Sequence, residues 1–117
     1  MTDSPLLLES LLPSGKDGMS RQAEVFALLA LGVLDALEGG ALSPDSARKR
    51  FFNGANCLYT HRALNRPDVE EVMSRGAELP DLFDALSLDD ATHQAQEEIA
   101  AMRAACLRIL TAERLVA

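Results

Sequence analysis

The feature that most constrains this chain is an apolar run near its start. Between Val25 and Leu34 no residue has a polar side chain, and Glu24 and Asp35 bound the run. A helix that is apolar on nearly all sides is either a core helix or a membrane span. A span needs about 20 apolar residues, and this run is shorter. We therefore predict a central core helix over residues 20–38.

Leucine and alanine dominate the apolar residues. The chain has 20 Leu and 18 Ala but only 5 Val and 2 Ile. Leu and Ala favour helices, whereas strands favour the β-branched residues that are scarce here. A chain of 117 residues fits one domain with a core of its own. We predict an all-α fold, with residues 1–117 forming a single-domain compact helical bundle of five or six helices.

Helix caps and breakers divide the chain into segments. Ser before Pro or Asp marks helix starts, and Gly marks helix ends. These signals predict an N-terminal arm and loop at 1–18 with a helix opening at Ser4-Pro5, the core helix at 20–38, a helix from Ser43 to Asn53-Gly54, a helix from Pro67 closed by Gly76, a helical turn from Pro80 to Leu86, and a long C-terminal helix at 88–114. Residues 55–66 fit either a short helix or a loop. We expect the arm to dock on the core rather than to swap onto a second copy.

Spacing predicts which side chains face the core. The long helix has a seam with steps of three and four residues, typical of packing against another helix, and its members are Ala91, Ala95, Ile99, Met102, Cys106 and Ile109. In the turn after Pro80, we expect Leu82, Phe83 and Leu86 to point inward. We also expect a neighbouring helix to approach closely at Gly32, where glycine costs about 1 kcal/mol relative to Ala.

Charge is distributed unevenly along the chain. The net charge is −7, which argues against general attraction to nucleic acid or anionic lipid. Residues 48–66, however, hold five bases and no acid, together with three of the five aromatic residues. Arg and aromatic side chains are enriched at interface hot spots. The predicted partner-binding residues are Arg48, Lys49, Arg50, Phe52, Tyr59 and Arg62. The alternative is that this basic segment balances acidic helices inside the fold.

Two groupings suggest chemistry, but the sequence favours a structural role for both. Cys57 and His61 share a face if their segment is helical, but a nucleophile pair also needs a cleft and an orienting group. Asp89, His93 and Glu97 are spaced by four, but bundle metal sites draw ligands from several helices, so a solvated face is the better interpretation. No dinucleotide, phosphate-loop, nucleophile-elbow or metalloprotease motif occurs. We predict no enzyme activity, no catalytic residue, no metal and no cofactor.

The start of the chain predicts its location. MTDSPLLLES is acidic, and Glu9 interrupts its leucines, unlike a secretory signal. Two cysteines without such a signal suggest a reducing compartment. We expect a cytoplasmic protein without a membrane span.

Two motifs carry a resemblance to a known group of proteins. LALGVLDALEGGALSPDSA, and SRGAELPDL followed by a long terminal helix, resemble a small family of short, all-helical bacterial proteins of unknown function. The resemblance covers the chain from about Arg21 onward and assigns no catalytic residue. It implies a protein that neutralises or assists a neighbouring gene product.

These observations predict a non-enzymatic protein that binds a protein partner, as an immunity-type, antitoxin-like or accessory factor. The alternative is a small nucleic-acid-binding regulator that uses residues 48–66. A third interpretation is an enzyme built around Cys57 and His61. The sequence leaves a homodimer open and does not identify the partner.

Overall fold

The structure is a computed structural model that describes residues 4–12 and 18–116, with side chains described for residues 4–12 and 21–112. Within these ranges the chain forms helices and no strand, which confirms the predicted all-α class. The helices are α1 (Leu8–Leu11), α2 (Gly18–Glu38), α3 (Pro44–Arg50), α4 (Gly54–Ala63), α5 (Pro67–Ala85) and α6 (Leu88–Val116). Of the predicted loop at 13–18, residues 13–17 lie outside the described residues, and Gly18 begins α2.

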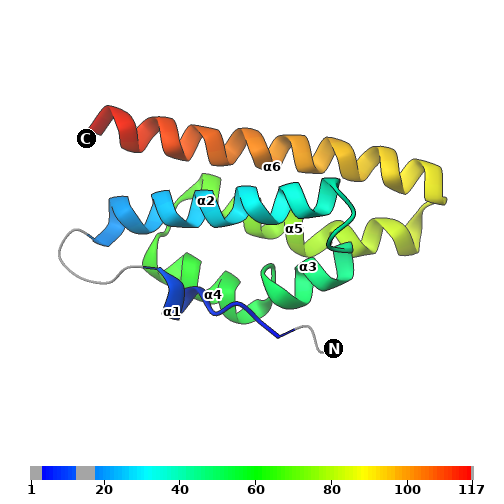
Figure 1. The fold of residues 1–117 in the computed structure, drawn as a ribbon, viewed down its shortest axis with the longest axis horizontal. Coiled ribbons are helices and arrows are strands. Elements are labelled where there is room, and N and C mark those ends of the chain that lie inside the picture. The colour runs from blue at the N-terminus through cyan, green and yellow to red at the C-terminus, as the bar shows by residue number, and fades with distance from the viewer. Residues whose placement is uncertain (1–3, 13–17, 117) are drawn as a thin grey trace.

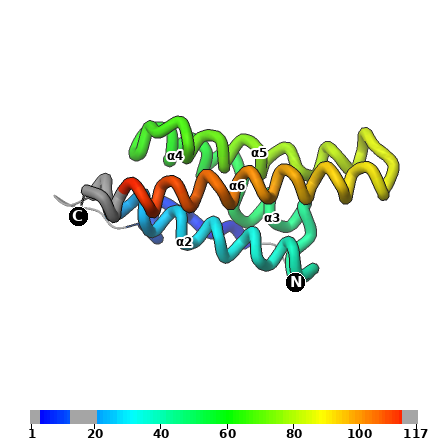
Figure 2. Tube along the Cα trace, turned by 90° about the horizontal axis from the view of Figure 1, so that it is seen from above, coloured from blue at the N-terminus to red at the C-terminus, as the bar shows by residue number. Residues whose placement is uncertain are grey.

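Helix α6 packs along two other helices at once. It runs back over α2 and α5, and it lies between them when the molecule is seen from above (Figures 1 and 2). Its 29 residues span about 43 Å at 1.5 Å per residue, close to the 47 Å length of the molecule. The six seam positions predicted from spacing are all buried. This long apolar seam therefore joins α2 and α5 on one side.

Helices α3 and α4 pack on the side of α2 and α5 that faces away from α6 (Figure 1). Phe51 and Phe52, which follow α3, are both buried. The ring of Phe51 stacks on Phe26 of α2 with centroids 6.1 Å apart, and it meets the ring of Phe52 edge-on at 5.1 Å. Phe52 in turn lies against Gly76 of α5. We call α3 and α4 the lower layer. The two aromatic residues thus connect the lower layer to both α2 and α5.

Helix α5 continues through Gly76 and Pro80, so the predicted break between two helices is wrong. A β-carbon at Gly76 would lie 2.3 Å from atoms of the Phe52 ring, which shows that glycine makes room for the ring here and does not end the helix. Pro80 has no N–H to donate to the carbonyl of Gly76. Both residues are nevertheless buried, and their packing outweighs the local breaker signal.

Helix α2 ends as its two glycines predict. Gly40 has a φ of 77°, and the N–H of Ala41 donates to the carbonyl of Ala36 at 2.8 Å. This pattern is a Schellman cap, which favours glycine at the residue with positive φ. Gly32, in contrast, is exposed, and a β-carbon added to it would meet no atom within 4 Å. The predicted close approach of another helix at Gly32 is therefore wrong for the described part of the chain.

The segment left open between helix and loop is helical, because it contains α4. Asn53 caps α4 by accepting a hydrogen bond from the N–H of Asn56 at 2.9 Å. The side chain of Asn56 is buried and holds the arm. Its Nδ2 donates to the carbonyls of Leu6 (2.7 Å) and Phe51 (2.9 Å), and its Oδ1 accepts from the N–H of Leu8 (3.0 Å).

The arm therefore docks on the core, as expected, but its helix begins later than predicted. The N–H of Leu6 donates to the carbonyl of Arg50 at 2.7 Å, and Leu8 is bound to Asn56. These two contacts keep residues 4–7 out of a helix, although Ser4-Pro5 is a good local start signal. Of residues 4–12, only Leu8–Leu11 are helical.

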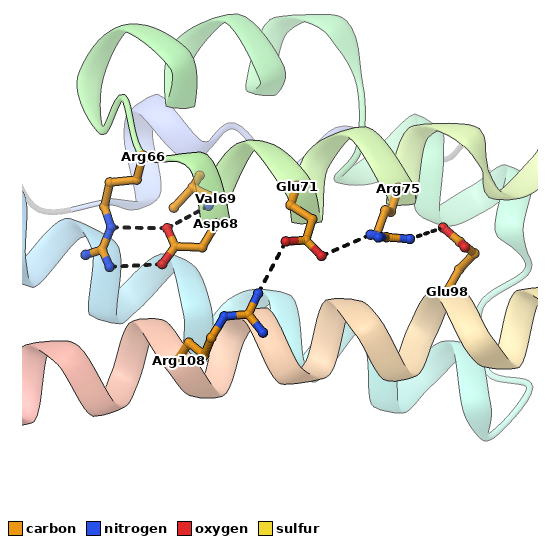
Figure 3. A network of polar contacts seen from close by, with 7 residues as sticks. All are labelled: Arg66, Asp68, Val69, Glu71, Arg75, Glu98 and Arg108. Carbon is orange, nitrogen blue, oxygen red and sulfur yellow. Dashed lines mark hydrogen bonds and ion pairs between the residues drawn. The ribbon is translucent and has the colours of Figure 1, made fainter.

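A row of ion pairs follows the contact between α5 and α6 (Figure 3). Arg75 of α5 donates to Glu71 at 3.1 Å and to Glu98 of α6 at 2.8 Å, and the hydrogen bond to Glu98 raises the pKa of Arg75 above its ordinary value. Arg108 of α6 lies 3.3 Å from Glu71. Pairs at this degree of exposure add about 0 to 1 kcal/mol each, so they align the two helices more than they hold them together.

Replacing Gly32 and replacing Gly76 by alanine should change the stability of the fold in opposite directions. Gly32→Ala should stabilise the fold by roughly 0.5 to 1 kcal/mol, because alanine is the better helix former and space is open. Gly76→Ala should destabilise it by roughly 1 to 3 kcal/mol, because the new methyl group overlaps the Phe52 ring. Urea unfolding of both variants measures the difference. Adding Phe52→Leu should reduce the loss of stability caused by Gly76→Ala. An equal gain of stability from alanine at both glycines would contradict the contact between Gly76 and the Phe52 ring.

Replacing Asn56 by alanine should release the arm. Three hydrogen bonds are lost, and buried backbone groups of Leu6 and Leu8 are left unpaired, so we expect a loss of roughly 2 to 4 kcal/mol. Urea unfolding measures the loss, and limited proteolysis should show faster cleavage between the arm and α2. Asn53→Ala, which removes a helix cap but no arm contact, is the matched control. Equal protease resistance of the Asn56 variant and wild type would show that the arm is held by other contacts.

Candidate partner-binding surfaces

The six side chains predicted to bind a partner do not share one surface. Phe52 is buried against Gly76 and cannot contact a partner in this fold. Tyr59 packs against the core, and its hydroxyl accepts a hydrogen bond from Gln22 of α2 at 3.4 Å. Arg48 and Phe52, although four residues apart, do not share a helix face, because α3 ends at Arg50. The aromatic residues of the basic segment thus serve the core.

The basic side chains of the segment have different surroundings. Arg48 is 3.6 Å from Asp45 and 3.4 Å from Asp81 of α5, as the internal charge-balance alternative predicts for this residue. The Nε of Arg50 is shielded from solvent and has no hydrogen-bond partner among the described residues. Lys49 and Arg62 are not buried. Whether Lys49, Arg50 and Arg62 contact a partner stays a prediction.

Cys57 and His61 both lie on α4, the helix that the nucleophile hypothesis requires. They are nevertheless not arranged as a nucleophile and its base. The Nδ1 of His61 pairs with the carboxylate of Glu70 on α5. Burial raises the pKa of the Cys57 thiol, whereas a nucleophilic cysteine needs a lowered pKa. Burial also raises the pKa of Cys106 to about 11. Both thiols therefore stay protonated at neutral pH.

The carboxylates and imidazole considered as metal ligands lie on an exposed face of α6. His93 is 3.3 Å from Glu97, and both side chains are largely in solvent. Asp89 is exposed as well. Among residues with described side chains, no three or more His, Cys, Asp or Glu come together as a metal site would require.

Helix α5 turns into α6 at one end of the molecule (right side of Figure 1), and three large apolar side chains of this turn are exposed. Their exposed fractions are 37% for Phe83, 42% for Leu86 and 73% for Leu88. The prediction that Phe83 and Leu86 point inward is therefore wrong. Phe83 continues the buried stripe of α5 that includes Gly76 and Leu79, because steps of three and four keep one helix face. The stripe simply extends beyond the helices that cover it.

Two neighbouring hollows adjoin Phe83. One has a volume of about 250 Å³ and is lined by Leu37, Glu38, Pro44, Leu79, Phe83, Thr92, Ala95, Gln96 and Ile99. The other has about 230 Å³ and is lined by Ser43, Pro44, Asp45, Pro80, Phe83 and Asp84. Phe83 and Pro44 line both. We call the two hollows, together with the exposed side chains of Phe83, Leu86 and Leu88, the corner surface.

The corner surface combines an apolar centre with acidic edges. Glu38, Asp45 and Asp84 line its hollows, and none of the Lys, Arg, His and Cys residues with described side chains does. The sequence contains a signal for it, since the stripe that begins at Val69 can be extended to Phe83 at helical spacing. That extension requires α5 to be one helix, and the Gly76 and Pro80 breaker signals conceal it.

Comparison with known protein families, with curated proteins and with solved structures finds no match to this chain. Within the described residues, no helix is both long enough and apolar enough to span a membrane.

The raised pKa values of the two thiols predict slow alkylation. At a pH of about 7.5, iodoacetamide should modify Cys57 more slowly than a free cysteine, because a raised pKa leaves less thiolate. Cys106, which is buried, should react only when the protein unfolds. Mass spectrometry of timed samples, with and without urea, measures both rates, and Cys57→Ser separates the two sites. Modification of Cys57 faster than free cysteine would restore the nucleophile hypothesis.

Proposed function

We propose that this protein is a non-enzymatic binding protein that attaches to a protein partner through the corner surface. The observation that carries the proposal is the exposure of Phe83, Leu86 and Leu88 at one end of the bundle. Grouped apolar side chains with polar edges are typical of protein interaction sites. Aromatic residues that fit against hollows are also frequent hot spots.

The size and chemistry of the hollows support a protein partner over a small molecule. Pockets for small ligands usually have volumes of about 300 to 1,000 Å³, whereas these measure about 250 and 230 Å³ and are open. Among the described residues, no histidine, cysteine or lysine accompanies their carboxylates in the lining. Such hollows suit individual side chains of a partner, and the thiols of this chain are not tuned for covalent catalysis.

The resemblance to short bacterial proteins implies an immunity-type, antitoxin-like or accessory role. Each of these roles requires binding to a partner protein. Both cysteines are free, which suits a reducing compartment. We therefore propose that the protein acts in the cytoplasm. The nucleic-acid alternative is less well supported, since Arg48 is paired with Asp45 and Asp81 and the net charge is −7.

Photo-crosslinking from single positions tests the site. A photoreactive amino acid is placed at Phe83 or Leu88, and for controls at Leu58 of α4 or Leu107 of α6, whose exposed fractions of 49% and 51% are comparable. In cells of the source organism, the corner positions should give one discrete protein adduct that the controls do not. Circular dichroism confirms that each variant is folded.

The same experiment separates the alternatives. Equal adducts at all positions, or none at the corner, would contradict the proposal. A further reactive residue at Lys49 or Arg62 reports on the basic segment. Protein adducts from those positions alone would favour the basic-segment site, and nuclease-sensitive adducts would favour the nucleic-acid alternative.

A further inference from the structure

We infer that the corner surface takes a basic, amphipathic segment of its protein partner. Apolar side chains of that segment occupy the hollows beside Phe83, and its lysines or arginines meet the surrounding carboxylates. The inference rests on the proposed function and specifies the chemistry of the partner.

Acidic groups outnumber basic ones at this end of the bundle. Its acidic side chains include Glu38, Asp45, Asp81, Asp84, Asp89 and Asp90, and two arginines, Arg48 and Arg103, pair with three of them. Arg103 pairs with Glu38, and Arg48 lies between Asp45 and Asp81. Asp84, Asp89 and Asp90 form no ion pair within the described residues. The corner surface therefore keeps negative charge that the fold does not neutralise.

The position of Asp84 makes it the most informative of these carboxylates. Asp89 and Asp90 lie in the first turn of α6, where the helix dipole favours negative charge, so helix stability alone accounts for them. Asp84 lies in the last turn of α5, with no basic residue in that turn, and the dipole disfavours negative charge there. It also lines a hollow next to Phe83. Its charge opposes helix stability and is placed where a cationic partner would neutralise it.

The same charges select among occupants. A second copy of this chain would bring like charges together across a symmetric contact, and nucleic acid would be repelled. A basic protein segment complements both the carboxylates and the apolar centre. Amphipathic helices commonly bind in this manner, with apolar anchors at intervals of three and four residues.

Binding of designed peptides tests the inference directly. The probe is a fluorescein-labelled amphipathic helix of about 18 residues made of Leu and Lys. The comparison peptides replace Lys with Glu, or Leu with Ser. Fluorescence anisotropy should show that the Leu/Lys peptide binds most tightly and that salt weakens its binding. Phe83→Ala and the double change Asp84→Lys with Asp89→Lys should each reduce affinity at least about tenfold.

Matched controls separate site-specific binding from general attraction to an acidic protein. Glu9→Lys with Glu24→Lys makes the same charge change on α1 and near the start of α2, at the opposite end of the bundle (Figure 1). Leu107→Ala removes an exposed leucine from α6. Both should bind the Leu/Lys peptide within about twofold of wild type, allowing for long-range attraction at moderate salt. Asp84→Asn, a milder change, should weaken binding in the same direction if Asp84→Lys does not fold.

The inference is overturned if the peptide with Glu in place of Lys, or the peptide with Ser in place of Leu, binds as tightly as the Leu/Lys peptide. It is also overturned if the corner and control variants weaken binding of the Leu/Lys peptide equally. Sedimentation showing a dimer that Phe83→Ala dissociates would identify a second copy as the occupant and would overturn it too. If crosslinks from Phe83 identify a partner whose affinity is unchanged by Asp84→Lys, the proposed function stands. The inference that the bound segment of the partner is basic is then wrong.

Discussion

The contacts of Phe51 and Phe52 connect every part of the lower layer to the rest of the bundle. Phe51 stacks on Phe26 of α2, and Phe52 occupies the space that glycine leaves on α5. The carbonyl of Phe51 also accepts a hydrogen bond from Asn56, which holds the arm. Two consecutive residues therefore fix the relative positions of α2, α4, α5 and the arm. Burial of two aromatic rings provides several kcal/mol for this arrangement, which surface ion pairs do not.

Sequence signals within one or two helical turns are sufficient to predict those parts of the structure that depend on neighbouring residues. The caps at Ser43 and Gly40 and the seam of α6 can be predicted because each involves neighbours within a turn or two. The predicted break at Gly76 is wrong because its glycine accommodates Phe52, 24 positions away in the chain. The late start of α1 has the same origin, since its backbone is bound by Asn56. Contacts between distant residues cannot be inferred from spacing alone.

The candidate site is harder to predict than the fold. A basic segment with aromatic residues resembles an interface in sequence, but the core uses Phe52 and the acidic helices use Arg48. Charge counts by segment do not show which carboxylates find a partner. Near the end of α5, Asp81 does and Asp84 does not within the described residues. The distinction depends on which helix turns face each other, and this follows only from the packing of α3 on α5.

Asn56 binds the arm through the main chain of Leu6 and Leu8 and not through their side chains. The binding site therefore recognises the path of the backbone, together with the buried side chains of Leu8 and Leu12. Most substitutions at exposed arm positions such as Leu7 leave these contacts intact, so sequence can change there without changing the fold. The arm in effect behaves as a tethered peptide ligand of its own domain, with a receptor site formed by α4 and the residues that precede it.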